Sequence, residues 1–443
     1  MTDDDPPKLC GWGRQCAPGR ERFSEDLEVL TRDAVLCRGL GRSYGDSSLP
    51  PPGQSVAANT TLANRIVTFD ESSGLIRCEA GVTLFDLNHL LLARGWFTPV
   101  SPGTQFVTIG GMVASDVHGK NNHRDGCFGE FVTELRMRVA DGRIVTCSPT
   151  VESDLFHATI GGMGLTGHIL EVEFTMTRIP SPWIYMESQR ITDIDAYIDA
   201  LKESGPDWPY TMGWIDCLSR GKRMGRGILM RGRWATPEEA PRRFKPLGNR
   251  VAVPFVLPSW VMGPLVGRTF NTVYYHRHVR KTQRRVIHPQ KFFYPLDAIE
   301  HWNRLYGPRG FTQYQCVLPE AAGRGAARRF LEVLTAKRAA SFLCVIKDCG
   351  AEGRGLLSFP MPGISIAVDI PVRDDIQDIV DSLNEFVIEQ GGRVYLTKDS
   401  FTRPEHFRQM EPRLEAWRSI REQWDPTLSL RSAQSIRVLG DPS

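Results

Sequence analysis

The first candidates for chemistry in this chain are glycines. Four glycine-rich segments lie in its first part: RGLGRSYGD (38–46), SPGTQFVTIGGMVASDVHGKNNH (101–123), DGCFGEFV (125–132) and TIGGMGLTGHILEVEF (159–174). Glycine lets backbone N–H groups converge on an anion, because no Cβ stands in the way, and successive N–H groups form a nest for phosphate oxygens. Any one loop has the alternative interpretation of a plain turn. Together, the four predict backbone wrapped around an extended ligand such as a dinucleotide.

The common dinucleotide motifs do not match. A Rossmann fingerprint needs G-x-G-x-x-G after a strand and at the start of a helix. In GLGRSYG the glycines Gly39, Gly41 and Gly45 are out of step, and the chain continues through DSSLPPP into a turn. No Walker sequence is present. A dinucleotide would therefore need another fold.

Short strands and turns dominate up to about residue 180. The ADGR segment (140–143) predicts a hairpin, since Asp-Gly supplies the positive φ angles of a tight turn. GVTLFDLNHLLLARG predicts a helix that Thr83 and Asp86 cap and Gly95 ends. The first domain is therefore predicted to be α+β.

From about residue 180 the sequence pattern changes. Strands are predicted at YTMGWIDCL, FTQYQCVLP, SFLCVIKDCG and ISIAVDIPV, and helices at EAAGRGAARRFLEVLTAKRAA and DDIQDIVDSLNEFVIEQGG. Period-two alternation places Gln313 and Gln315 on one face of a strand and Tyr314 on the other. Thr402 and Glu405 predict a capping box for one last long helix.

The composition is that of an ordinary globular protein. Of 443 residues, 41% are hydrophobic and 24% charged, and the net charge of +3 does not indicate a polyanion binder. No run approaches the roughly 20 apolar residues of a membrane span, and the acidic start does not resemble a signal peptide. These features favour a cytoplasmic location. The ten scattered cysteines predict reduced thiols, with neither a disulfide framework nor a metal site.

One local oddity is the basic segment RHVRKTQRRVIHP (277–289). Two interpretations stay open: a solvated basic loop, and a peripheral contact between residues 277–285 and an anionic membrane surface at the inner membrane. A nucleic-acid role has only this loop behind it, and we expect none.

The motifs then resemble a known family. GLGRSYGD, PGT, VTIGGMVASDVHGKN, FG and TIGGMGLTG, in that order, resemble the PCMH-type FAD-binding domain of the vanillyl-alcohol-oxidase superfamily. HGKN, NRLYGPRGFTQYQCVLP, SFPMPG and GGRVYLTKDS resemble the decaprenylphosphoryl-β-D-ribose 2-oxidase family of arabinan precursor synthesis for the cell wall. The resemblance runs from GWGR at residue 11 to DP near residue 425.

The resemblance implies a two-domain α+β flavoprotein. Residues 1–178 would form the FAD-binding domain, 179–392 an antiparallel-sheet substrate domain, and 393–443 a segment returning to the FAD domain. The implied reaction is FAD-dependent oxidation of a secondary sugar hydroxyl to a ketone, at C2 of a polyprenylphosphoryl-β-D-ribose, as the first half of an epimerisation. An NAD(P)H-dependent keto-reductase would be the partner enzyme. Two alternatives stay open: an oxygen-dependent aldonolactone or alditol oxidase, and a non-catalytic flavin-binding scaffold.

The resemblance also implies which residues contact FAD. They are Arg38, Gly39, Gly41, Arg42, Ser43, Tyr44, Gly45, Gly103, Thr104, Thr108, Gly110, Gly111, Ser115, Asp116, His118, Gly119, Gly162, Gly167, Ile169 and Tyr395. In several relatives a histidine in a THG motif carries FAD covalently. Here the motif reads DVHGKN, the form of the family members that hold FAD without a covalent bond, so non-covalent FAD is expected.

For the chemistry, the resemblance places Lys398 nearest the reacting carbon, with Tyr44, His118 and Tyr395 as further candidates for proton transfer; which of them is the base stays open. The implied substrate residues are Lys120, Gln313, Gln315, Lys347, Ser365 and Lys398. The family pattern PGWNICVDFP reads PGISIAVDIP here, so Ser365 and Ala367 replace an asparagine and a cysteine, and Phe293 replaces a tyrosine.

Overall fold

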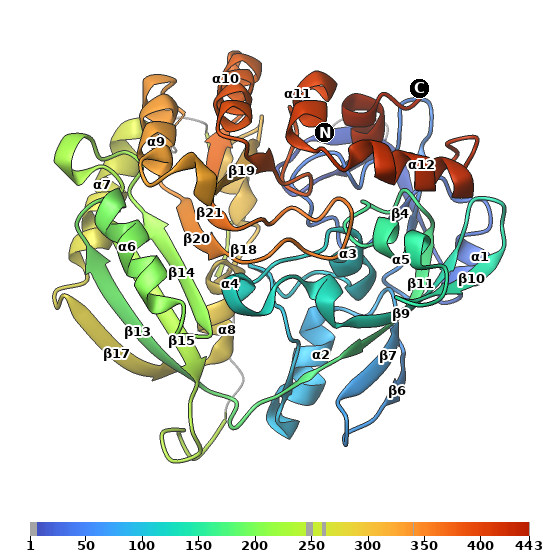
Figure 1. Cartoon of the computed structure of the whole chain (residues 1–443), viewed down its shortest axis with the longest axis horizontal. Helices are drawn as coiled ribbons and strands as arrows, with labels where there is room; N and C mark the ends of the chain where they lie inside the picture. The colour runs from blue at the N-terminus through green and yellow to red at the C-terminus, as the bar shows by residue number, and fades with distance from the viewer. Residues whose placement is uncertain (1–6, 245–250, 259–262, 340, 443) are drawn as a thin grey trace.

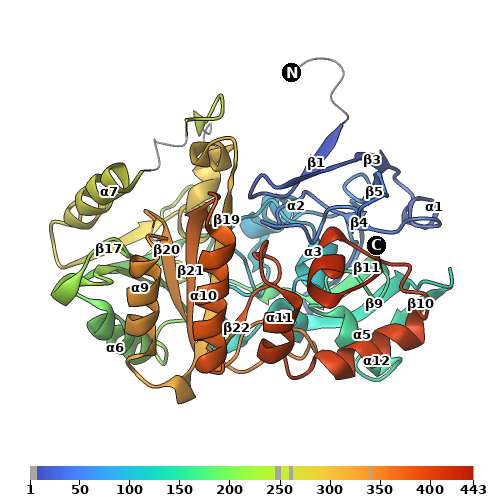
Figure 2. The same ribbon diagram turned by 90° about the horizontal axis from the view of Figure 1, so that it is seen from above.

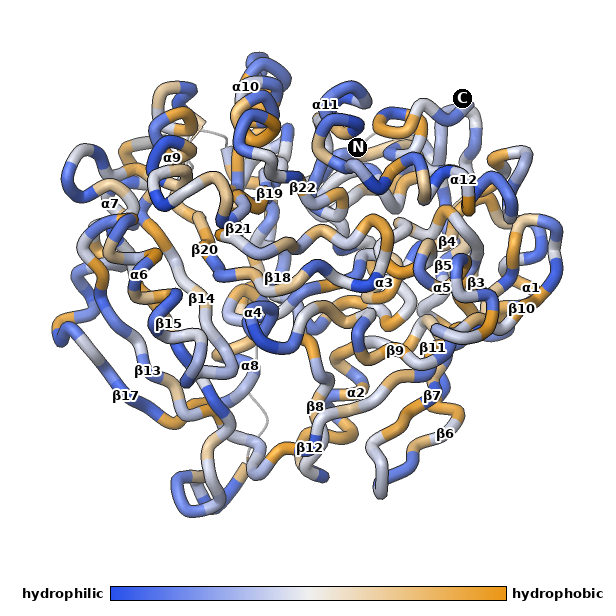
Figure 3. Tube along the Cα trace, in the orientation of Figure 1, coloured by the Kyte–Doolittle hydropathy of each residue, from blue (hydrophilic) through white to orange (hydrophobic). Residues whose placement is uncertain are grey.

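The computed structural model describes residues 7–244, 251–258, 263–339 and 341–442. The chain forms two lobes that lie side by side, and its last helices return across the first lobe (Figure 1). Hydrophobic segments gather in the interior and hydrophilic segments follow much of the outer edge (Figure 3). No helix among the described residues has both the length and the hydropathy to cross a bilayer.

The first lobe combines small sheets with short helices. A β1–β2 hairpin precedes a parallel sheet of order β3-β5-β4, and a five-stranded antiparallel sheet has the order β10-β9-β11-β7-β6. The strands are β1 (Lys8–Cys10), β2 (Cys16–Pro18), β3 (Arg20–Phe23), β4 (Cys37–Arg38), β5 (Val56–Asn59), β6 (Ile66–Phe69), β7 (Leu75–Glu79), β8 (Trp96–Phe97), β9 (Val132–Arg138), β10 (Ile144–Cys147), β11 (His168–Thr175) and β12 (Thr177–Arg178). The helices are α1 (Leu27–Leu30), α2 (Leu84–Leu91), α3 (Ile109–Ala114), α4 (Asn122–Asp125) and α5 (Ser153–Thr159).

Two local predictions in this lobe are confirmed. β9 and β10 pair as an antiparallel hairpin, and Gly142 in its turn has a φ of +89°. Helix α2 has the expected capping box between Thr83 and Asp86, and Gly95 ends the 3-10 turn that follows it, in the left-handed conformation.

The second lobe is built on one eight-stranded sheet of order β17-β13-β15-β14-β20-β21-β19-β22, in which every pairing is antiparallel. Its strands are β13 (Ile184–Ile191), β14 (Tyr210–Ile215), β15 (Gly227–Trp234), β17 (Thr282–Ile287), β19 (Phe311–Pro319), β20 (Cys344–Cys349), β21 (Gly363–Pro371) and β22 (Arg393–Val394). The short strands β16 (Val251–Ala252) and β18 (Ile299–Glu300) pair with each other in parallel.

Helices cover both faces of this sheet. α6 (Ile194–Ser204), α9 (Ala326–Ala336) and α10 (Ile376–Glu389) lie on one face, and α7 (Pro264–His276) lies on the other (Figure 2); α8 (Pro289–Phe293) follows β17. The predicted alternation along β19 is confirmed, because the buried Tyr314 hydroxyl donates to Asn384 of α10 on the face opposite Gln313 and Gln315.

The prediction of one long C-terminal helix is wrong. The chain forms two helices, α11 (Pro404–Met410) and α12 (Leu414–Trp424), and α11 has no side-chain cap. The break falls at Glu411–Arg413 because Pro412 has no N–H to donate and disfavours helical backbone in the residue before it. The buried Trp417 of α12 donates its indole N–H to Ala158 of α5, which fastens this segment to the first lobe.

The expectation that all ten cysteines are reduced is also wrong. Cys10 and Cys16 form a disulfide across the β1–β2 hairpin, whose register pairs these two residues with their Cα atoms 4.0 Å apart. The other eight are free thiols. The basic loop is corrected too, because part of it is β17, which pairs with β13 at the edge of the large sheet.

Candidate active site

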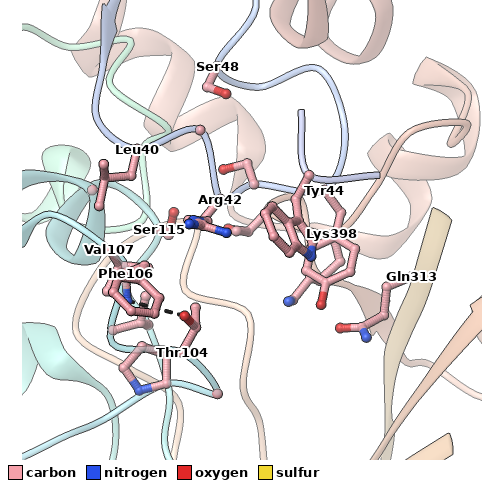
Figure 4. Close-up of a pocket in the computed structure, with 18 of the residues that line it drawn as sticks. Leu40, Arg42, Tyr44, Ser48, Thr104, Phe106, Val107, Ser115, Gln313 and Lys398 are labelled. Atoms are coloured by element: carbon pink, nitrogen blue, oxygen red, sulfur yellow. Dashed lines mark hydrogen bonds between the residues drawn. The ribbon is translucent and has the colours of Figure 1, made fainter. Parts of the chain in front are cut away.

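A cavity of about 550 Å³ opens between the two lobes. Its walls come mainly from residues 37–48, residues 102–118, residues 296–302, strands β19, β20 and β21, and residues 395–398. Figure 4 shows Arg42 and Tyr44 from the first part facing Lys398 from the last, with Gln313 of β19 beside them. A pocket of this size lies within the usual range for cofactor and substrate sites.

The loop at 38–46 is held by backbone hydrogen bonds on both sides. The N–H groups of Trp12 and Gly13 donate to the carbonyls of Ser43 and Tyr44, and the N–H of Tyr44 donates to Thr397 O. A Cβ on Gly45 would stand 1.8 Å from Asp399 O, so this close approach requires glycine. The loop is thus placed between the hairpin tip and the segment that carries Lys398.

Two arginines of this loop have different surroundings. Arg38 donates to Glu21 Oε1 at 2.9 Å and to the carbonyls of Ser48 and Cys10, so it fastens the loop to its neighbours. Arg42 lies over the ring of Trp12, with 4.1 Å between its Cζ and the ring centroid. Arg42 brings a cation to the cavity wall.

The second wall is the loop that leads into α3. Thr108 caps this helix by accepting from Gly111 N–H, and a Cβ on Gly39 would stand 2.4 Å from Thr108 Oγ1, so the two glycine loops touch. Gly103 lines the cavity, and a Cβ on it would meet no protein atom within 4 Å. Thr104 Oγ1 accepts from Phe106 N–H (Figure 4).

Most of the predicted cofactor residues line this cavity. They are Arg38, Gly39, Gly41, Arg42, Ser43, Tyr44, Gly103, Thr104, Thr108, Gly111, Ser115, His118 and Tyr395. The others do not line it: Gly45, Gly110, Asp116, Gly119, Gly162, Gly167 and Ile169. They pack against neighbouring protein atoms instead. A Cβ on Gly167, for example, would stand 2.3 Å from Met137 Cε, and Ile169 is buried within β11.

Asp116 is the charged member of this group. It is fully buried, accepts from Gly129 N–H at 2.8 Å, and accepts from the Ser358 hydroxyl. Burial raises the pKa of Asp116 to about 6, against these hydrogen bonds. Asp116 therefore connects the 101–119 loop to residues near Ser358.

Lys398 lines the cavity and has a strongly lowered pKa. Its Nζ lies 3.7 Å from the centroid of the Tyr44 ring. Burial lowers the pKa of Lys398 to about 7; the Asp369 carboxylate opposes this shift and Lys347 adds to it. A lysine with such a pKa is partly unprotonated at neutral pH, whereas an exposed lysine is almost wholly protonated there.

Asp369 was not found from the sequence. It is fully buried on β21, where it accepts from the Tyr306 hydroxyl and from Gln313 Nε2, both at 2.6 Å. Burial raises its pKa to about 6, and Lys398 opposes that shift. The available signal was a single charged residue inside the largely apolar run ISIAVDIPV.

His118 lies between two polar side chains of the large sheet. Its Nδ1 is 3.1 Å from Lys347 Nζ, and its Nε2 is 3.1 Å from Gln315 Nε2. Burial lowers the pKa of His118 well below its usual value, and Lys347 and Lys398 lower it further, so the imidazole is neutral at pH 7. Burial raises the pKa of both Tyr44 and Tyr395, so both phenols keep their protons.

The predicted substrate residues divide into two groups. Gln313, Gln315, Lys347 and Lys398 line the cavity, as does Ala367. Lys120 and Ser365 lie behind the wall: Lys120 Nζ donates to Phe293 O at 2.8 Å, and Ser365 accepts from Gln315 at 3.2 Å. Within the described ranges, no three His, Cys, Asp or Glu side chains gather as a metal site would require.

The residues present fit a dinucleotide. The open space at Gly103, the hydroxyls of Ser43, Thr104 and Ser115, and the Arg42 cation suit phosphate oxygens and ribose, while Phe106 and Val107 supply apolar contact. Such a cradle suits FAD, whose chemistry is redox and whose binding and orientation fall to the protein.

Comparison with known proteins decides the family. A family model described as an FAD binding domain matches residues 30–148. The chain is 33% identical over 439 residues to decaprenylphosphoryl-β-D-ribose oxidase of Mycolicibacterium smegmatis, which covers 95% of this chain and 94% of that protein. This chain belongs to the decaprenylphosphoryl-β-D-ribose oxidase family. It is thus an FAD-dependent oxidoreductase with the two-domain vanillyl-alcohol-oxidase fold.

Two other relatives help to place the chain within this family. An uncharacterized protein from the mprA 5′ region of Streptomyces coelicolor is 31% identical over 373 residues, covering 81% of this chain and all of that protein. A putative D-arabinono-1,4-lactone oxidase of Neurospora crassa is 32% identical over 159 residues, covering 35% of this chain and 28% of that protein. The match to the lactone oxidase is therefore local, whereas the other two matches cover most of this chain.

Gly103 offers a test of where FAD binds. Gly103→Val adds a side chain at a cavity-lining position where a Cβ meets no protein atom, so we expect FAD affinity to fall about tenfold or more, which is ~1.4 kcal/mol, with no change in the apoprotein's melting temperature. Titration of apoprotein with FAD, followed by flavin fluorescence, measures the affinity.

Gly205→Val is the matched control, because Gly205 lies outside the cavity and a Cβ there makes only ordinary contacts. Equal FAD affinity of the Gly103 variant and the wild type would contradict this placement of the cofactor.

Proposed function

We propose that this protein oxidises the C2 hydroxyl of a polyprenylphosphoryl-β-D-ribose to a ketone, as the first half of an epimerisation to the arabinose form. The observation that carries the proposal is Lys398, a lysine with a pKa near 7 beside Tyr44 in a cavity that fits FAD. The relative from Mycolicibacterium smegmatis, named for oxidation of decaprenylphosphoryl-β-D-ribose, supports this choice of substrate.

The proposed role of Lys398 is that of the base. Oxidation of a secondary alcohol removes a hydride from carbon and a proton from oxygen, and bound FAD supplies the acceptor for the hydride. Tyr44 and Tyr395 hold their protons too tightly to act as bases, and His118 binds a proton too weakly. The unprotonated Lys398 amine is matched to neutral pH and takes the hydroxyl proton.

Asp369 and Gln313 position this chemistry. Asp369 holds the amide of Gln313 at 2.6 Å, which fixes the direction in which Gln313 presents its remaining groups to the cavity. Gln315 of β19 and Lys347 of β20, the two strands that flank β21, contact His118, so a polar face borders the space next to Lys398. We assign this face to the hydroxyls and the phosphate of the sugar.

The alternatives have weaker support. An aldonolactone or alditol oxidase would rest on a relative that covers 35% of this chain. A flavin-binding scaffold would have no use for a lysine whose burial brings its pKa to about 7 at the cavity wall, since that burial opposes folding with the lysine charged. Both features favour a working oxidase of a lipid-linked pentose.

Three further points belong to this proposal. FAD is held without a covalent bond, because His118 stands in a DVHGKN motif where the covalent relatives have THG, and its ring lies 3.1 Å from both Lys347 Nζ and Gln315 Nε2. The keto product needs an NAD(P)H-dependent reductase as partner enzyme, since epimerisation restores the alcohol. The protein works at a membrane surface, which it contacts through residues 277–285.

Acid precipitation tests the attachment of FAD. We expect the yellow flavin to leave with the supernatant, because the DVHGKN motif differs from the THG motif of the relatives that bind FAD covalently. Absorbance of the supernatant and the pellet measures the distribution. Flavin that stays with the washed, denatured pellet would overturn non-covalent binding.

Anaerobic mixing tests the substrate. With a polyprenylphosphoryl-β-D-ribose, we expect the flavin absorbance to bleach within the turnover time. The reduced flavin should accumulate, because no oxygen is present to reoxidise it. Free ribose and free polyols, which lack the phosphate and the lipid, serve as controls and should leave the spectrum unchanged. Bleaching by the free polyols alone would support the alditol oxidase instead.

A further inference from the structure

Helix α7 presents apolar side chains to solvent. Val266, Phe270 and Val273 recur at helical spacing along one stripe and are 47%, 47% and 63% exposed. Leu265, at 78%, and Val279, just beyond the helix, at 82%, extend the apolar surface. Single exposed apolar residues need no explanation, but five within 15 residues form a patch that water does not favour.

The opposite face of α7 is fully occupied. Asn271 is buried and donates to Asp216, and Tyr275 is buried beneath the Arg226 guanidinium. Tyr274 packs edge-on against Trp214 of β14, with 4.8 Å between ring centroids. The helix is therefore anchored to the large sheet by its polar and aromatic face, and its aliphatic stripe is left outward.

Basic side chains follow the apolar stripe directly in the sequence. Arg277, Arg280 and Lys281 lie in the exposed turn after α7, and Arg285 lies on β17. With Val279, Thr282 and Gln283, the arginines line a shallow hollow. Arg284 differs from them, because it pairs with Glu187 at 2.7 Å. An aliphatic stripe and a cationic turn are thus joined on one continuous segment, residues 265–285.

This segment is coupled to the active-site cavity by aromatic packing. The ring of Phe270 lies 5.5 Å from Phe342, and Phe342 lies 5.9 Å from Tyr306, whose hydroxyl donates to Asp369. Leu343, the next residue in the chain, lines the cavity. Packed rings therefore connect α7 with the carboxylate that faces Lys398.

A second apolar surface lies at the part of the cavity that β18 lines. Val251 of β16 is 71% exposed and pairs with Ile299 of β18, which lines the cavity and is itself partly exposed. Phe255, a few residues on, is 63% exposed. Apolar side chains are thus exposed at the cavity wall as well as along α7.

We propose that residues 265–285 form a lipid-docking surface that seats the cavity against an anionic bilayer. Amphipathic helices bind bilayers by burying an apolar face at the boundary of headgroups and acyl chains, and neighbouring Lys and Arg side chains are attracted to anionic lipids. A nucleic acid would match the cations but not Leu265, Val273 or Val279. The docking deepens the proposed function and rests on it, since a lipid-linked sugar resides in the membrane.

Sedimentation with vesicles tests this surface in the FAD-loaded protein. We expect binding to vesicles of phosphatidylcholine with phosphatidylglycerol, weaker binding to phosphatidylcholine alone, and release by high salt. Arg277→Glu with Arg280→Glu and Lys281→Glu should weaken binding by about tenfold or more. Leu265→Gln with Val273→Gln and Val279→Gln should weaken binding at low salt by about tenfold or more, although these changes leave every charge in place.

Matched controls are available on the first lobe and on α11. Arg32→Glu with Arg408→Glu reverses exposed charges, and Leu90→Gln with Val151→Gln removes exposed apolar groups, away from the docking surface. We expect these variants to bind vesicles like the wild type. Wild-type protein that stays in the supernatant with anionic vesicles, or docking variants that bind as well as the controls, would overturn the proposal.

Flavin reduction separates this proposal from the proposed function. With detergent-dispersed polyprenylphosphoryl ribose, the docking variants should reduce flavin at the wild-type rate, because no cavity residue is changed. Vesicle binding without any flavin reduction by this substrate would contradict the proposed function and leave the docking surface standing. Flavin reduction without vesicle binding would do the reverse.

Discussion

The active site depends on one junction between distant parts of the chain. Tyr44 N–H donates to Thr397 O, and Gly45 packs against the backbone of Asp399. Arg437 reinforces this junction, since its guanidinium binds Asp46 at 2.7 Å and Asp399 at 2.9 Å. Because the glycine loop and the 395–399 segment are locked together, the Tyr44 ring lies under Lys398 and the FAD cradle has a fixed position relative to the lysine.

That fixed position decides the chemistry of Lys398. Removal from water destabilises its charged form, and Asp369 restores only part of the loss, so its pKa lies near 7. The same burial raises the pKa of Asp369 to about 6, and the carboxylate is held by Tyr306 and Gln313. Lysine and carboxylate are thus a pair whose protonation changes near neutral pH, in a cavity to which both lobes contribute.

Local features of the fold could be predicted from the sequence, and features set by distant contacts could not. The Thr83 capping box, the hairpin at 140–143 and the alternation around Tyr314 depend on neighbouring residues alone, and each was predicted. The Cys10–Cys16 disulfide depends on strand register, which spacing does not show. Asp369 is held in place by hydrogen bonds from Tyr306 and Gln313. These partners lie 63 and 56 residues away in the sequence, so the sequence alone does not show that they meet. Pro412 was a readable helix break that the strong apolar periodicity obscured.

The central claim is that Lys398 accepts the substrate proton, and the pH dependence of flavin reduction tests it most directly. In the anaerobic reaction with polyprenylphosphoryl ribose, the rate should rise with pH through an apparent pKa of about 7, as the lysine loses its proton. Lys398→Met should lower the rate ~10²- to 10⁴-fold and abolish that rise. A Lys398→Met variant that keeps both the rate and the pH profile of the wild type would contradict the account.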